Sequence, residues 1–252
     1  MHRSGTSMFA HLLYRLGLYL GEKEDLVPAG ESNVDGHWEH MGFLQLNENI
    51  LRSYGGSWDL PPSLADGWHK EESLQEARSN ALDLIESFQA QERWCWKDPR
   101  SSLTMPFWLD LLPDMRVVVC LRNPLEVAIS LRRRGISSIA FGLNLWKTYN
   151  RNLLATVPQD QYIVTHYDTY FHRPQVEIRR VLDFAGIPAS DQLISLTRSR
   201  VIRGLRNNFS TSDELLEFDS SGEVYDLYSR MCEEAEWNPD AHPPALSISS
   251  ST

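Results

Sequence analysis

Residues 115–130 read MRVVVCLRNPLEVAIS and join an apolar run directly to a helix start. The run lacks an alternation of apolar and polar residues, which is typical of a strand covered on both faces. Asn123 can cap a helix, and Pro124 suits a first turn because that turn leaves its N–H groups unpaired. The stretch therefore predicts a buried parallel strand that is followed at once by a helix.

Two more apolar runs are predicted strands, RWCWK at 93–97 and QYIVTHY at 161–167. Strands that alternate with helices favour an α/β fold with a parallel sheet, in which ligands bind at the carboxyl ends of the strands. The apolar spacing predicts helices at 8–20, 42–56, 69–91, 102–112, 124–134, 140–155, 174–185 and 190–198.

Composition limits the classes of partner. The chain has 252 residues, is 42% hydrophobic and shows no compositional break, so we expect one domain over 1–236 and a disordered, proline-rich tail over 237–252. The net charge of −10 argues against a nucleic-acid or anionic-membrane partner. No stretch approaches the roughly 20 apolar residues of a membrane span. Cys95 and Cys120 lie in apolar runs as expected of buried thiols, and we expect a cytoplasmic protein.

The stretch HRSGTS at residues 2–7 precedes an amphipathic helix. A turn at Gly5 aims backbone N–H groups and the positive end of the helix dipole at one point, where hydroxyls and Arg3 add donors. This pattern indicates an anion site, and it also describes an ordinary helix cap built from Ser and Thr. The sequence contains no Gly-Lys-Ser/Thr, so we expect the anion to bind without a metal ion.

A second anion-binding pattern follows the strand within 115–130. Arg122 stands at the mouth of that strand, and Ser130 lies roughly 9 Å along the following helix at 1.5 Å per residue. An arginine side chain spans several ångströms, so the two residues can hold one phosphate. The alternatives are a salt bridge of Arg122 at the strand end and a structurally neutral Ser130.

Together, HRSGTS and LRNPLEVAIS resemble the two cofactor signatures of sulfotransferases that use 3′-phosphoadenosine 5′-phosphosulfate (PAPS). The similarity is to the bacterial and Golgi-type branch, where arginine replaces the loop lysine of the cytosolic enzymes. It extends over about residues 1–210, through WKDPRSSLTMPFWLDLLP at 96–113, DGHWEH at 35–40 with LNENIL at 46–51, and HYDTYFHRPQVEIRRVLDFAGIP at 166–188. The resemblance implies a three-layer, P-loop-like α/β fold whose central parallel sheet is flanked by helices.

The resemblance also implies ligand contacts. Arg122 and Ser130 would bind the 3′-phosphate of PAPS, without a metal. The 5′-phosphosulfate would contact the loop residues Arg3, Ser4, Gly5, Thr6 and Ser7. The family's basic, glycine-rich cofactor loop has only a loose match at 203–209, where Arg203 or Arg206 would touch the 3′-phosphate or form a solvated basic turn.

For catalysis, the family position and strand-end placement assign Lys97, with Arg3, to the leaving oxygen. A lysine at such a place is also commonly held by a carboxylate such as Asp98. Glu39 matches the glutamate of the family's G-x-x-E segment and is the expected general base, with His37 as second choice. The alternative for these two residues is a polar loop packed around a tryptophan.

Flanking residues complete these expectations. Asp98 and Arg100 are expected to orient Lys97, and the basic run at 132–134 to complement a helix end. Trp38, Trp58 and Trp68 fall in loops that would flank an acceptor, where rings stack on sugars or pack inward.

The predicted function is transfer of a sulfuryl group from PAPS to a hydroxyl, with a sugar or glycan acceptor favoured. The alternatives are another P-loop nucleotide-dependent transferase or kinase, and a catalytically dead nucleotide-binding module. The usual strand before the loop has no counterpart here, so we expect Met1 to be an internal methionine that follows a short apolar strand.

Overall fold

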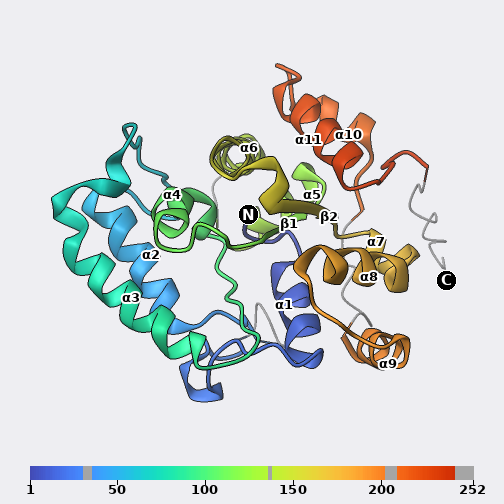
Figure 1. The fold of residues 1–252 in the computed structure, drawn as a ribbon. Coiled ribbons are helices and arrows are strands. Elements are labelled where there is room, and N and C mark those ends of the chain that lie inside the picture. Colours follow the sequence, from blue (N-terminus) through green and yellow to red (C-terminus); the bar gives the residue numbers. More distant parts are fainter. Residues whose placement is uncertain (31–35, 136–137, 202–208, 242–252) are drawn as a thin grey trace.

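The computed structural model describes residues 1–30, 36–135, 138–201 and 209–241. In this part of the chain, a parallel sheet of two strands, β1 (Val117–Leu121) and β2 (Tyr162–His166), lies near the centre of the molecule (Figure 1). The strands pair in register from Val117 with Tyr162 to Leu121 with His166. Their carboxyl ends therefore meet at one edge of the sheet, which is where the site residues that follow them gather.

Helices surround the sheet much as the apolar spacing predicts, but the helices at Thr169–His172, Ser212–Phe218 and Glu223–Glu234 were not predicted. Short 3₁₀ turns occur at Lys23–Asp25, Trp68–Lys70, Glu72–Leu74 and Gln159–Gln161. The α-helices are α1 (Thr6–Arg15), α2 (Met41–Ser53), α3 (Gln75–Gln89), α4 (Ser101–Leu111), α5 (Pro124–Arg132), α6 (Ile139–Thr156), α7 (Thr169–His172), α8 (Pro174–Ala185), α9 (Asp191–Val201), α10 (Ser212–Phe218) and α11 (Glu223–Glu234).

The sheet is covered on both faces, as the expected three-layer fold requires. Val119 and Leu121 point into a core shared with α5, α6 and α11. Val118 and Cys120 point the other way, against α1, α8 and α9. A third apolar cluster joins α2, α3 and α4, which lie together at the left of Figure 1. Successive strand side chains alternate between faces, so a continuous apolar run is what two-sided burial demands.

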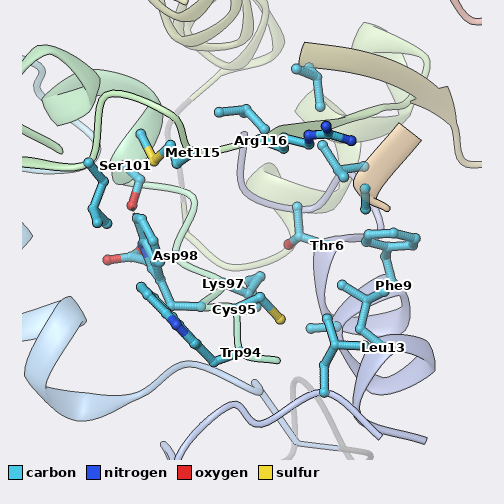
Figure 2. A pocket seen from close by; sticks show the side chains of 18 of the residues that line it. Thr6, Phe9, Leu13, Trp94, Cys95, Lys97, Asp98, Ser101, Met115 and Arg116 are labelled. Carbon is cyan, nitrogen blue, oxygen red and sulfur yellow. Dashed lines mark hydrogen bonds between the residues drawn. The ribbon is translucent and has the colours of Figure 1, made fainter. Parts of the chain in front are cut away.

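The predicted strand at 93–97 is not a strand. In the described chain it forms one isolated parallel bridge, between Trp94 and Tyr19. A cavity of about 960 Å³ separates it from the edge of β1 that faces away from β2 (Figure 2). An apolar run becomes a strand only where another backbone lies within hydrogen-bond distance, and no described backbone fills this space.

Trp237, the first residue of the predicted tail, belongs to the core. Its side chain is buried, and its ring stacks on the His166 ring with centroids 5.1 Å apart. Residues 242–252 of the predicted tail lie outside the described chain, as do Arg203 and Arg206. Within the described residues, no helix is long and apolar enough to cross a membrane.

The contact between α5 and α6 depends on a glycine. A Cβ at Gly142 would lie 2.8 Å from the Cβ of Ala128. We expect Gly142→Ala to lower the free energy of unfolding by about 1–2 kcal/mol, because overpacking costs more than the helix propensity of alanine returns. Asn144→Ala, on the exposed face of α6, should leave stability within about 0.5 kcal/mol. Urea unfolding measures both, and a stabilised Gly142→Ala protein would contradict this packing.

Candidate active site

The loop before α1 has the backbone of an anion-binding turn. Arg3 and Gly5 have φ angles of 64° and 83°, in the left-handed region, and Gly5 caps α1. Ser4 is 1% exposed, and its hydroxyl has no hydrogen-bond partner among the described residues. A buried hydroxyl without a partner is costly unless a ligand completes it. The loop therefore fits a group that carries acceptor oxygens.

Gly5 lets the loop lie directly against Tyr167, the residue after β2. A Cβ at Gly5 would stand 2.4 Å from Cδ2 of Tyr167. The same ring lies under the guanidinium of Arg122, with Cζ 4.6 Å from the ring centroid. The end of β2 thus supports both predicted halves of the anion site, a cation–π contact being favourable for Arg122.

Two hydrogen bonds join the loop before α1 to the stretch that follows β1. Nε of Arg3 donates to Oγ of Ser130 at 2.8 Å, and Nη1 of Arg122 donates to the carbonyl oxygen of Arg3 at 3.2 Å. The structure thus brings Arg3, Arg122 and Ser130 together. Burial and the charges of Arg134 and Arg122 lower the pKa of Arg3 to about 10, which still leaves it a cation near neutral pH.

Arg122 also forms the strand-end salt bridge that the sequence left open as an alternative. Its Nη2 lies 2.8 Å from Oε2 of Glu126, one turn along α5. Asn123 caps α5 as predicted, its side chain accepting a hydrogen bond from the N–H of Leu125 at 2.9 Å. The salt bridge of Arg122 and the helix cap of Asn123 are thus both present. Arg122 keeps its contact with Arg3 as well.

Glu39 and Lys97 form a nearly buried ion pair. Nζ of Lys97 donates to Oε1 of Glu39 at 2.6 Å, and the two side chains are 11% and 9% exposed. Burial lowers the pKa of the Lys97 ammonium, while the Glu39 carboxylate partly opposes that shift. The predicted base and the predicted leaving-group cation are therefore direct neighbours. Lys97 pairs with Glu39, whereas the sequence suggested Asp98 as its carboxylate partner.

Asp98 and Arg100 hold the other side of this pair. Arg100 lies 2.9 Å from Asp98, 3.2 Å from Glu48 and 3.7 Å from Oε2 of Glu39. Asn47 on α2 donates to Oδ2 of Asp98 at 2.8 Å. Arg100 therefore links Asp98 to Glu39, and this network acts on Lys97 only through Glu39. The sequence predicted that Asp98 and Arg100 orient Lys97 directly.

His37 and Trp38 lie beside the loop. The hydroxyl of Ser7 donates to the carbonyl oxygen of His37 at 3.2 Å, and burial lowers the pKa of the His37 imidazole. The ring of Trp38 stacks on His11 with centroids 4.5 Å apart and lies 4.9 Å from the Tyr14 ring. Trp38 thus packs inward against two rings of α1, as the alternative interpretation expected, and still keeps intermediate exposure.

The other two loop tryptophans differ from each other. Trp58 is partly exposed, and its ring centroid lies 4.6 Å from that of His2, the residue before Arg3. Trp68 is 5% exposed and packs on Tyr54 in the α2–α4 core, so it does not flank an acceptor and that expectation is wrong for this residue.

Arg134 lies near the site, although the sequence predicted only that it complements a helix end. The charge of Arg134 acts on Arg3, His37 and Glu39, which places it within electrostatic range of both the loop and the ion pair. Arg134 lies in the turn just past the end of α5 at Arg132, four residues after Ser130. Its closeness to Ser130 along the chain was the available sequence signal.

The loop and Lys97 border one cavity (Figure 2). Thr6 at the start of α1 and Lys97 both line it, and Phe9 and Trp94 add apolar walls. The sequence predicted that the loop and Lys97 serve one reaction, and both border this cavity. Among the described residues, no group of three or more His, Cys, Asp or Glu side chains forms a metal site.

Comparison with known proteins agrees with this geometry. Residues 1–191 match the sequence profile described as the sulfotransferase family, and the chain belongs to that family. The sulfotransferase STF9 from Mycobacterium avium has a similar fold, with a TM-score of 0.56 and 13% identity over 94% of this chain and 76% of that one. The protein therefore has a sulfotransferase fold and belongs to a family of sulfuryl-transfer enzymes.

Two further solved domains were compared. The sulfotransferase domain of the Synechococcus PCC 7002 olefin synthase aligns with a TM-score of 0.49 and 17% identity, covering 91% of each chain. The sulfotransferase domain of the curacin biosynthetic pathway gives 0.49 and 14%, covering 94% of this chain and 95% of that one. No curated protein matches the sequence.

The approach of Gly5 to Tyr167 can be tested against a second glycine. Gly17 shares the left-handed conformation, with a φ of 93°, but a Cβ there would meet nothing within 4 Å. We expect Gly17→Ala to cost about 1 kcal/mol of stability, and Gly5→Ala at least about 1 kcal/mol more, because Tyr167 must also move. Urea unfolding measures both. Equal losses would show that Tyr167 does not press against the loop.

Proposed function

We propose that this protein transfers the sulfuryl group of PAPS to a hydroxyl of a carbohydrate or glycan. The observation that carries the proposal is the bonded set of Arg3, Ser130 and Arg122, which joins the loop to the end of β1. One cation cluster can then serve both phosphate groups of a 3′,5′-substituted nucleotide. The family membership supports the reaction class.

For the donor, the proposal assigns the loop to the 5′-phosphosulfate. The N–H groups at the start of α1 point out of the helix end, and the partnerless Ser4 hydroxyl supplies a further donor. Arg122 and Ser130 take the 3′-phosphate, with Arg134 adding positive charge nearby. A forked guanidinium suits phosphate oxygens better than an ammonium does.

For the transfer, Glu39 accepts the proton of the acceptor hydroxyl as its oxygen attacks sulfur. The bond between sulfur and the bridging 5′-phosphate oxygen breaks, and Lys97 and Arg3 stabilise the charge that develops on that oxygen. The products are a sulfate ester and the 3′,5′-bisphosphate. The contact between Glu39 and Lys97 supports this division of roles, because the base and the cation must both reach the same sulfuryl group.

For the acceptor, the proposal assigns a sugar ring to Trp38 and Trp58. Trp38 and Trp58 have intermediate exposure, their rings contact those of His11 and His2 respectively, and aromatic faces suit sugar rings. Trp38 follows His37 and precedes Glu39, so a sugar stacked there would bring a hydroxyl close to the base.

The decisive test of donor binding is adenosine 3′,5′-bisphosphate, the desulfated product. We expect it to stabilise the protein by about 2.7 kcal/mol at a hundredfold excess over Kd, without added magnesium. Differential scanning fluorimetry measures the shift, and mass spectrometry of glycan acceptors incubated with PAPS measures transfer. No thermal shift at millimolar bisphosphate would reject the proposal, and binding without any transfer would favour an inactive nucleotide-binding protein.

The base is tested by Glu39→Gln, with His37→Gln as the matched control. We expect Glu39→Gln to lower kcat at least about a hundredfold, because general-base catalysis contributes on that order, and to leave the Kd of the bisphosphate within about threefold. His37→Gln should keep most of its rate. If Glu39→Gln stays active while His37→Gln does not, the imidazole is the base. Circular dichroism checks that each variant is folded.

A further inference from the structure

A buried carboxylate stands beside the proposed 3′-phosphate site and has no role in the transfer. Glu126 on α5 is 2% exposed. Its Oε2 accepts a hydrogen bond from Nε of Arg122 at 2.8 Å and lies 2.8 Å from Nη2 in the same ion pair. Arg122 therefore already has a counter-ion in the free protein, on the edge of the guanidinium that otherwise suits a phosphate.

The second oxygen of Glu126 reaches another part of the chain. Oε1 accepts from the N–H of Ser210 at 3.1 Å, and Nδ2 of Asn123 donates to the carbonyl oxygen of Ser210 at 3.0 Å. Ser210 directly precedes Thr211, the cap of α10. Glu126 thus links Arg122 to the segment that enters the C-terminal helices.

Binding of a phosphate to Arg122 creates a charge conflict. One guanidinium would face a buried carboxylate and a dianion at the same time, and like charges at short range disfavour the ionised form of the weaker acid. Protonation of Glu126 resolves the conflict. A neutral carboxyl still accepts a hydrogen bond through its carbonyl oxygen, so the bond from Ser210 survives the loss of charge.

The surroundings of Glu126 make that protonation easy. Burial raises the pKa of its carboxyl to about 7, with Arg122 opposing the rise and the Asp168 carboxylate adding to it. Arg122 after β1, Asp168 after β2 and the Tyr228 phenol on α11 all act on it electrostatically.

We propose that Glu126 is a positioning residue that takes up one proton when the 3′-phosphate of a nucleotide binds to Arg122. This inference rests on the proposed donor site. Arg122 then exchanges a carboxylate for a phosphate while its contacts with Tyr167 and Arg3 remain in place. Nucleotide affinity consequently rises as the pH falls.

The sign of the effect follows from linkage. The pKa of Glu126 is about 7 without ligand, and a bound phosphate raises it further. Between those two values the complex holds more protons than the free protein, so we expect the nucleotide to bind more tightly at pH 7 than at pH 8. The ligand acts in the opposite direction, because a phosphate monoester with a second pKa near 6 loses charge as the pH falls.

Isothermal titration calorimetry with adenosine 3′,5′-bisphosphate tests the proposal at pH 7.5, in HEPES and in Tris. The difference between the two binding enthalpies gives the number of protons exchanged. We expect the unaltered protein to take up a substantial fraction of a proton with the bisphosphate. Adenosine 5′-phosphate, which lacks the 3′-phosphate, should cause no uptake.

Two variants locate the proton. Glu126→Gln should abolish the uptake and the tighter binding at the lower pH. Glu177→Gln removes another buried carboxylate that pairs with an arginine, Arg180, in the contact between β2 and α8, and should behave like the unaltered protein.

The outcomes separate the two proposals. Uptake that persists in Glu126→Gln, or is equal for both nucleotides, overturns the role of Glu126. Proton release on bisphosphate binding does so as well, and this measurement needs no variant. Absence of bisphosphate binding at every pH overturns the proposed donor site instead.

Discussion

The guanidinium of Arg122 is the contact on which the site depends. It reaches the carbonyl oxygen of Arg3 in the loop, the carboxylate of Glu126 on α5 and the ring of Tyr167 after β2. Parallel strands in register deliver Arg122 and Tyr167 to the same edge of the sheet. Gly5 then lets the loop approach that edge without a side chain in the way. Loop, sheet and helix are thus fixed relative to one another by one planar cation.

Cations gather locally in this chain although its overall charge is acidic. The net charge is −10, yet Arg3, Lys97 and Arg122 converge on the loop, and Lys97 and Arg122 each contact a buried carboxylate. Such pairs hold the cations in place at the cost of desolvation, and an incoming anion must compete with the carboxylates. The proposed donor site would therefore be ordered before binding, and its affinity would depend on how readily Glu39 and Glu126 separate from Lys97 and Arg122.

Much of the fold was readable from local pattern. The Val/Cys/Leu run over Val117–Leu121 is a strand covered on both faces, and α5 begins at Pro124 behind the Asn123 cap. The predicted strand at 93–97 had equally strong apolar character and still failed, because a strand needs a neighbouring backbone and a cavity lies on that side of β1. Trp68 and Trp237 show the same limit, since a loop or tail tryptophan joins the core only when distant helices provide a surface for it.

The sequence by itself determined the sulfotransferase resemblance, the helix that follows the anion-binding loop, and the residue types able to hold phosphate. These features depend on neighbours within a few residues, such as a glycine turn or a helix cap. Only the tertiary structure decided the partners of the charged groups. Lys97 pairs with Glu39 and not with the adjacent Asp98, Arg3 bonds to Ser130, and Glu126 reaches Ser210. Each of these contacts joins segments far apart in the chain, so it is set by how the helices pack around the sheet.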